Sequence, residues 1–364
     1  MPSRLAPLDF ERLDGLSDDD CLAAFRCFER SARAFVEGRQ SPRPARAPSR
    51  RLIGAAHAAL RAEVGDAAGA REFFSRCFRP FRVAPDGEAE GFLTGYYEPF
   101  IAASRVETKD FSWPILARPS DLVSLGPGEA PAALPPGFTA ARRLKDGSLV
   151  PYEEREAIER MRRGAIVWLR DAVEAFLVQV QGSAQAQFPD GSRARLAYDG
   201  RNGHPYASIG RLLIESGEIA EGAMSLAALK AWLRGAGLLE GERGLNLMRR
   251  NRSFVFFRLL EDFDPNIGPV AGAGVALTPL RSIAVDRALW SYGLPFFIEA
   301  EMPWTDHSPQ PFRQLMVAQD TGSAIVGPAR ADIFFGCGDV AGERAGAIRH
   351  SGAFTVLLPH GDGP

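Results

Sequence analysis

The N-terminal part of the chain has the hydrophobic pattern of a helical scaffold. Apolar residues recur at helical spacing over 8–38, and Ser17 with the acids that follow it is typical of a helix start. A stretch rich in Pro, Arg and Ser at 40–50 predicts a linker. Helical spacing returns over 51–79 and predicts two more helices, broken near Gly65. We expect no catalytic residues in this region.

The pattern changes to that of strands at Gly91. The segment 91–106 is rich in Phe, Tyr, Thr and Val, with Gly and Pro between them. Thr94, Tyr96 and Tyr97 place hydroxyls and aromatic faces there. Aromatic faces stack on sugar rings, but they also fill cores. Taken alone, this local pattern favours core packing for both tyrosines.

The middle of the chain alternates between loops, helices and short strands. Residues 119–150 are rich in Pro and Gly and predict loops, while helices are expected in four further places: 152–163, from 208, 224–238 and 241–250. The apolar residues of 165–181 predict two buried strands, and 178–188 predicts a hairpin that presents the amides of Gln179 and Gln181 on one face. Such amides suit hydroxyl and acetamido groups, or else form a solvated sheet face. His204 has no Ser or Cys nucleophile near it in the sequence and is expected to be structural or groove-lining.

Three aspartates accompany predicted strands near the C-terminus. Asp286 follows an apolar triplet, Asp320 follows the apolar run 315–318, and Asp332 opens another apolar strand. Asp is a poor strand former and is costly to bury unpaired. A turn that binds its own backbone explains any one of them. Their recurrence within one all-β segment indicates a shared function.

Composition limits the class of protein. A chain of 364 residues can bury a large core in two or three domains, and 46% hydrophobic with 24% charged residues is typical of globular proteins. The net charge of −2 argues against a dedicated nucleic-acid binder. There is no apolar run long enough to span a membrane, and the first residues lack a signal-peptide pattern. The sequence alone thus predicts either a cytoplasmic protein or one whose leader was removed.

The cysteines do not predict a zinc site. The chain has no CxxC and no Cys/His cluster with zinc spacing. We expect buried free thiols at all of its cysteines: Cys21, Cys27, Cys77 and Cys337.

Three kinds of chemistry would use strand-associated aspartates. A Mg²⁺ or Ca²⁺ site is one, although the DxDxDG loop spacing is absent. An aspartic protease is the second, because Asp320 begins a DTGS; with no second DTG or DSG it would have to be a dimer sharing one proton, and Gln319 replaces the apolar residue expected before it. Sugar chemistry is the third. Hydrolytic glycosidases use two carboxylates, whereas non-hydrolytic cleavage needs one if the substrate's own hydroxyl is the nucleophile.

Sequence blocks in a fixed order favour the third alternative, because they resemble the membrane-bound lytic murein transglycosylase A family. These blocks are GFLTGYYEPF (91–100), VPYEEREAI (150–158), VQVQGSAQ (178–185), YDGRNGHPYASIGRLLI (198–214), NRSFVFF (251–257), IAVD (283–286), AQDTGSAIVGPARADIFFG (318–336) and AGERAG (341–346). The resemblance implies a mainly β fold with accessory α-helices. Residues 1–103 and 263–364 would form the catalytic domain, a double-psi β-barrel with the N-terminal helices, and 104–262 an inserted second β-barrel with the glycan groove between them.

The resemblance also implies an activity. The family cleaves the MurNAc-β-1,4-GlcNAc bond of peptidoglycan without water and leaves a 1,6-anhydro-MurNAc product, with no metal or other cofactor. The expected partners are peptidoglycan glycan strands and other cell-wall enzymes, not nucleic acid. We expect a monomer in the periplasm or at the outer membrane, although no lipid-anchor cysteine is evident. The alternatives left open are a non-catalytic glycan-binding barrel module and a dimeric aspartic protease that uses Asp320.

Residue roles carry over position by position. The family's three barrel aspartates match Asp286, Asp320 and Asp332, and its single catalytic acid falls on Asp332, which makes the other two supporting residues. Ser323 and Ala184 replace glycines of the family pattern, small residue for small.

The chemistry of the matching blocks adds two further expectations. Five residues are candidates for substrate binding: Thr94, Tyr96, Tyr97, Gln181 and Ser183. The apolar neighbours of Asp332, together with an ionised Asp320, are expected to raise its pKa; these neighbours are Ile333, Phe334 and Phe335.

Overall fold

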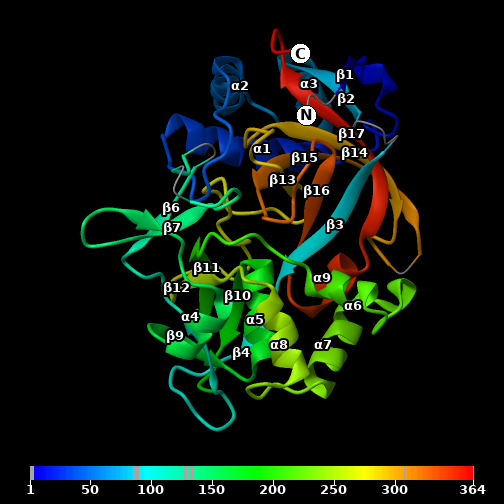
Figure 1. Cartoon of the computed structure of the whole chain (residues 1–364). Coiled ribbons are helices and arrows are strands. Elements are labelled where there is room, and N and C mark those ends of the chain that lie inside the picture. The colour runs from blue at the N-terminus through cyan, green and yellow to red at the C-terminus, as the bar shows by residue number, and fades with distance from the viewer. Residues whose placement is uncertain (1–3, 85–89, 127–128, 132–133, 307, 364) are drawn as a thin grey trace. The chain divides into compact units, whose positions relative to one another are not determined.

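The computed structural model describes residues 4–84, 90–126, 129–131, 134–306 and 308–363 (Figure 1). The chain divides into two compact units. Unit 1 combines Met1–Tyr97 with Asn266–Pro364, and unit 2 is the intervening Glu98–Pro265. The chain therefore leaves unit 1 slightly earlier, and re-enters it slightly later, than the boundaries we expected at 103/104 and 262/263.

Unit 1 is built on a closed β-barrel. Its strands are β3 (Gly91–Glu98), β13 (Ser282–Val285), β14 (Pro295–Met302), β15 (Gln310–Asp320), β16 (Arg330–Cys337) and β17 (Arg349–Pro359). They follow one another in the order β17-β14-β15-β13-β16-β3, and β3 pairs again with β17, which closes a six-stranded barrel. β1 (Arg4–Pro7) and β2 (Phe78–Ala84) extend the sheet beyond β17. The closed barrel confirms the expected fold class.

Helices complete the hydrophobic core of unit 1. They are α1 (Cys21–Val36), α2 (Arg50–Arg61), α3 (Ala67–Cys77), α9 (Asp339–Gly346) and the short η1 (Phe10–Arg12). Phe25 of α1 meets Phe73 of α3 edge to face, with 4.9 Å between ring centroids. The break between α2 and α3 lies near Gly65, as predicted. However, α1 begins at Cys21 with Asp20 as its N-cap, slightly later than the start at Ser17 and the acids after it that the sequence suggested.

A buried amide ties α1 to the barrel just before Asp320. The Nε2 of Gln319 donates to the carbonyl oxygen of Cys27 and to the hydroxyl of Ser31, each at 2.8 Å. Its Oε1 accepts from Ser282 at 2.6 Å. Because Gln319 is fully buried, these partners are needed to satisfy its amide. The polar residue that interrupts the apolar run thus fixes the end of β15.

Unit 2 contains small sheets and helices. The strands are β4 (Phe100–Ala102), β5 (Trp113–Leu116), β6 (Leu122–Ser124), β7 (Ala140–Arg143), β8 (Leu149–Val150), β9 (Ala165–Leu169), β10 (Ser183–Gln187), β11 (Arg193–Arg201) and β12 (Val255–Leu260). They form the sheets β12-β11-β10-β4, β5-β9 and β6-β7-β8. The helices are α4 (Arg155–Met161), α5 (Ala172–Gln181), α6 (Ile209–Glu215), η2 (Glu221–Ala223), α7 (Leu226–Gly235) and α8 (Arg243–Arg250).

The prediction of a strand at the end of 165–181 is wrong. This segment is helix α5, which Asp171 caps by accepting from the backbone N–H of Glu174 at 2.9 Å and which Gly182 ends in the left-handed conformation. The apolar residues of α5 pack into two core clusters on different sides of the helix. The helix therefore lacks the polar stripe by which an amphipathic helix is recognised in a sequence. The hairpin forms instead between β10 and β11 around a turn at 189–192. Gln179 and Gln181 therefore belong to a helix, and Gln179 is buried.

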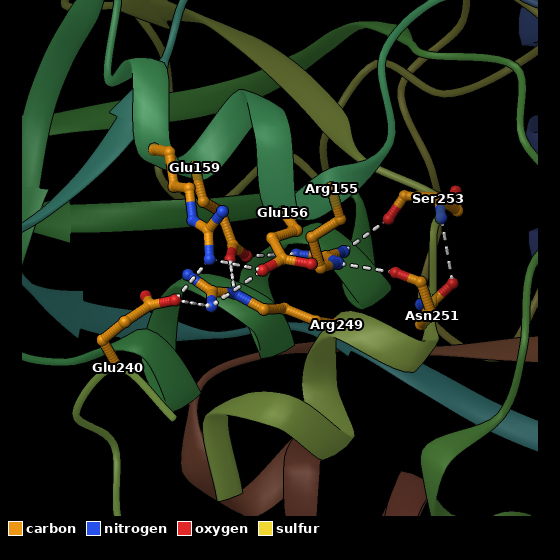
Figure 2. Close-up of polar contacts among 8 residues, drawn as sticks. Arg155, Glu156, Glu159, Glu240, Arg249, Asn251 and Ser253 are labelled. Carbon is orange, nitrogen blue, oxygen red and sulfur yellow. Dashed lines mark hydrogen bonds and ion pairs between the residues drawn. The ribbon is translucent and has the colours of Figure 1, made fainter. Parts of the chain in front are cut away.

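Paired charges are buried between α4 and α8 of unit 2 (Figure 2). The guanidinium of Arg155 donates to the carbonyl oxygens of Asn251 and Ser253, at 2.8 and 2.5 Å. Glu159 accepts from Arg155 at 3.2 Å and from Arg249 at 3.1 Å. Each buried charge has a partner of opposite sign, which is the condition under which buried ions are tolerated. The network holds both helices to the segment that enters β12.

The structure also bears on the expectations for His204, the cysteines, the segment 268–286 and membrane-spanning helices. His204 is buried, with Nε2 at 2.7 Å from the carbonyl oxygen of Tyr152, so its role is structural. None of the four cysteines, all of which the structure describes, forms a disulfide, as predicted, but Cys77 and Cys337 are partly exposed. Within 268–286, the structure has β13 and a bridge between Val270 and Ala276. Within the described ranges, no helix is both apolar enough and long enough for a membrane crossing.

Candidate active site

The barrel places Asp320 and Asp332 on either side of one small residue. Ala284 of β13 is the register partner of Asp320 on β15 and of Asp332 on β16. Register partners project their side chains to the same face of a sheet, and adjacent strands lie about 4.8 Å apart. The Cα atoms of the two aspartates are therefore roughly 10 Å apart, with only a methyl group between their side chains. Strand pairing thus unites two carboxylates that are twelve positions apart in sequence.

Asp332 is anchored by the hydroxyl of Thr94. The Oγ1 of Thr94, on the neighbouring strand β3, donates to its Oδ1 at 2.6 Å. The Nη2 of Arg330 donates to the same Thr94 oxygen at 2.7 Å. Asp332 remains partly accessible to solvent. A carboxyl group that is both anchored and reachable is suited to exchange a proton with a ligand.

Burial raises the pKa of Asp332 from its ordinary 3.8 to about 6. Arg330 and the hydrogen bond from Thr94 oppose this increase, and the charge of Asp320 adds to it. Phe334 shares the face of Asp332 because it lies two positions along the strand, and its ring is 5.4 Å from that of Tyr96. We expected Ile333 and Phe335 to contribute in the same way, but they point to the other face, into the main core of unit 1.

Asp320 organises the polar groups around it. Its Oδ2 accepts from the hydroxyl of Tyr96 at 3.0 Å, and its Oδ1 accepts from the backbone N–H of Gly272 at 2.9 Å. Arg43 forms an ion pair with Oδ1 at 3.6 Å. A side chain at Gly272 would place its Cβ 2.6 Å from the hydroxyl of Tyr292, so only glycine brings the backbone this close. The carboxylate of Asp320 is thus buried, and its oxygens are already bound by these groups.

Asp286 stabilises the loop that follows Asp320. Its Oδ1 accepts from the backbone N–H of Ala288 at 2.9 Å and its Oδ2 from that of Gly327 at 2.8 Å. Both carboxylate oxygens are therefore occupied by backbone donors. This geometry fits a supporting role and leaves no oxygen of Asp286 directed at a reaction.

The predicted substrate-binding residues separate into different environments. Thr94 lies beside Asp332. The hydroxyl of Tyr96 donates to Asp320, and the ring of Tyr96 is buried. Tyr96 therefore supports the site and offers no aromatic face on which a sugar could stack. Tyr97 points to the opposite face of β3 and packs against α9, where a Cβ at Gly342 would lie 2.7 Å from its ring. Gln181 ends α5 and Ser183 begins β10, both in unit 2, and Ser183 is buried.

Sequence reasoning missed two arginines of the site. Arg43 lies in the segment predicted as a linker, and no local pattern connects it with Asp320. Arg330 could have been found, because it lies two positions before Asp332 on the same strand and therefore on the same face. The described residues contain no group of three His, Cys, Asp or Glu side chains close enough to hold a metal ion. Nor does a hydrogen bond join Asp320 and Asp332 in this part of the chain.

Family models match both units. The MltA specific insert domain matches residues 92–258, and the 3D domain matches residues 281–358. Asp286, Asp320 and Asp332 all lie in the second match.

Individual relatives extend the match over most of the chain. The membrane-bound lytic murein transglycosylase A of Escherichia coli K12 is 33% identical over 272 residues, which cover 73% of this chain and 65% of that protein. The match thus falls just short of two thirds of this curated relative's length. The crystal structure of a membrane-bound lytic murein transglycosylase from Agrobacterium tumefaciens aligns with a TM-score of 0.85 at 34% identity, covering 98% of this chain and 97% of that one.

A ligand-bound structure is also similar. The crystal structure of E. coli MltA with bound chitohexaose aligns with a TM-score of 0.65 at 27% identity, covering 99% of this chain and 92% of that one. Both the sequence and the fold of the two units are thus those of one family. The chain belongs to the membrane-bound lytic murein transglycosylase A family.

Proposed function

We propose that this protein is a peptidoglycan lytic transglycosylase that cleaves the MurNAc-β-1,4-GlcNAc bond and leaves a 1,6-anhydro-MurNAc end. The observation that carries the proposal is the anchored and accessible carboxyl of Asp332, whose pKa burial raises to about 6. Family membership supports the reaction class, and the chitohexaose bound by the E. coli relative supports an amino-sugar chain as ligand.

One carboxyl group is sufficient for both proton transfers. Protonated Asp332 donates its proton to the glycosidic oxygen as the bond from that oxygen to the MurNAc anomeric carbon breaks. The C6 hydroxyl of the same MurNAc then forms a bond to that carbon. Its proton passes to the carboxylate of Asp332, which restores the starting state. Atoms balance without water or any cofactor.

The remaining residues have supporting roles in this proposal. Asp320, with Tyr96 and Arg43, maintains the charged surroundings of Asp332, and Asp286 holds the loop after β15. Unit 1 is the catalytic domain. Unit 2 contributes glycan contacts, for which Gln181 and Ser183 supply an amide and a hydroxyl. The enzyme acts as a monomer on periplasmic glycan strands at the outer membrane, alongside other cell-wall enzymes.

Product mass tests this function. Purified protein is incubated with isolated peptidoglycan, and the released fragments are separated and weighed by mass spectrometry. We expect fragments that end in anhydro-MurNAc, each lighter by one water than the corresponding hydrolysis product.

Other products would identify a different function. Fragments with free reducing ends would mean a hydrolase. Intact glycan that co-sediments with the protein would mean a binding module, and pepstatin-sensitive peptide cleavage would mean an aspartic protease.

A further inference from the structure

The hydrogen bonds of Thr94 fix the direction of its proton. A guanidinium group only donates, so the bond at 2.7 Å between Arg330 and Thr94 uses an acceptor lone pair of the hydroxyl. The hydroxyl has one proton to give. Asp332 Oδ1, at 2.6 Å, is the acceptor within its reach among the described residues. Arg330 therefore orients Thr94 so that it donates to Oδ1.

The two oxygens of Asp332 consequently differ. Oδ1 accepts from Thr94, whereas Oδ2 accepts from no side chain or backbone group in the part of the chain that the structure describes. An oxygen that already receives a hydrogen bond is the poorer place for a carboxyl proton, because that proton would be directed at another donor. We propose that Arg330 and Thr94 form a relay that makes Oδ2 of Asp332 the oxygen that gives and retakes the proton. This proposal rests on the catalytic role of Asp332 argued above.

The relay also explains why Arg330 does not contact Asp332 directly. Among the described residues, Arg330 makes no ion pair with this carboxylate; its Nη1 binds the carbonyl oxygen of Ala331 and its guanidinium lies over the ring of Phe92, 5.2 Å from the centroid. A direct ion pair would strongly favour the ionised form and deprive the site of its acid. With Thr94 in between, the arginine polarises the hydroxyl while the carboxyl of Asp332 keeps its proton up to about pH 6.

Other charged groups near Asp332 do not replace the relay. Asp320 is negative and is bound by Tyr96 and Arg43. On β17, Arg349 is the register partner of Thr94 but is exposed to solvent. Arg330 is thus the cation bonded to the hydroxyl that anchors Asp332, and we assign it as a positioning residue that acts through Thr94.

Infrared spectroscopy tests the proposal without turnover. The C=O band of protonated Asp332, isolated by subtracting the spectrum of Asp332→Asn at a pH of about 4.5, reports whether its carbonyl oxygen receives a hydrogen bond. If Oδ2 carries the proton, Oδ1 is that carbonyl oxygen. The band should then move to higher wavenumber in Thr94→Val and in Arg330→Gln. It should stay in place in Thr94→Ser and Arg330→Lys, which keep the donors.

Kinetics give a second measure of the same relay. In Arg330→Gln and Thr94→Val, the pH above which kcat/KM falls should increase, because each change removes a group that favours the ionised carboxyl. The value of kcat/KM below that pH should fall about tenfold or more. The double variant should be no worse than the more impaired single variant, since both act on one hydroxyl. Arg26→Gln, which removes an exposed arginine of α1, should match the wild type in both measurements.

The outcomes separate this inference from the proposed function. An unchanged band and an unchanged pH limit in Thr94→Val, beside normal anhydro products from the wild type, would overturn the relay and leave the function standing. A shifted band in a protein that releases no anhydro product would support the relay and reject the function. If Arg330→Gln does not fold, the comparison of Thr94→Val with Thr94→Ser decides alone.

Discussion

Replacing Asp332 with Asn should abolish glycan cleavage and at the same time stabilise the folded protein at pH 7. Asn keeps the shape of the side chain and an oxygen that can accept from Thr94, but it cannot donate a carboxyl proton or take one back. General acid or base catalysis contributes about 10²–10⁴-fold for each transfer, so a loss of at least ~10³-fold in kcat is expected.

The gain in stability follows from the raised pKa. The folded state holds the proton of Asp332 up to about pH 6, whereas the ordinary carboxyl loses it near 3.8. Between these values the folded state binds more protons than the unfolded one, so the free energy of unfolding of the wild type decreases as the pH rises through this window. Above it, the wild type should be less stable than Asp332→Asn by roughly 2 kcal/mol.

Denaturant unfolding at several pH values measures this difference. The two proteins should converge below about pH 3, where Asp332 is protonated in both states. Asp110→Asn, in an exposed loop, should show no such divergence and should cleave normally. Turnover close to that of the wild type in Asp332→Asn would reject the catalytic assignment.

Replacing Asp320 with Ala should destabilise unit 1 by about 2–5 kcal/mol, because several donors lose their acceptor together. The hydroxyl of Tyr96 and the backbone N–H of Gly272 both donate to Asp320, and the ion pair with Arg43 is lost as well. Without the charge of Asp320, the pKa of Asp332 should also fall, so kcat/KM should begin to decline at a lower pH.

A double-mutant cycle isolates the part of this destabilisation that comes from the hydrogen bond between Tyr96 and Asp320. Tyr96→Phe removes the hydroxyl that Asp320→Ala would leave buried, so the double variant should be less destabilised than the sum of the two single ones by about 1 kcal/mol. Chemical unfolding of the four proteins gives this coupling energy. Strict additivity would mean that the bond between Tyr96 and Asp320 contributes nothing to stability.

The strands of the barrel and the aspartates beside them could be predicted from the sequence. Apolar runs mark β15 and β16 clearly, and Asp320 and Asp332 stand out because Asp is rare in strands. Their proximity was not available from local sequence alone, since it depends on both strands pairing with Ala284 of β13. The alternation of side chains along β3 decides the roles of the two tyrosines, because Tyr96 shares the face of Thr94 and Tyr97 does not.

The errors also have physical causes. Helix α5 was mistaken for a strand because it is buried on more than one side and therefore lacks a polar stripe. Arg43 was missed because it meets Asp320 only through the tertiary fold. We expected all three apolar neighbours of Asp332 to raise its pKa. Alternation along β16, however, directs only Phe334 to the face of Asp332.

The most direct test of this account is the titration of the Asp332 carboxyl itself. Aspartate labelled with ¹³C at the carboxyl carbon gives one resonance per side chain, and the resonance absent from Asp332→Asn identifies the group. Its chemical shift is then followed from about pH 3 to pH 9 in the intact protein. We predict a midpoint at about pH 6. A midpoint near 3.8 would mean that Asp332 is already ionised where the enzyme works, and would contradict its role as the acid.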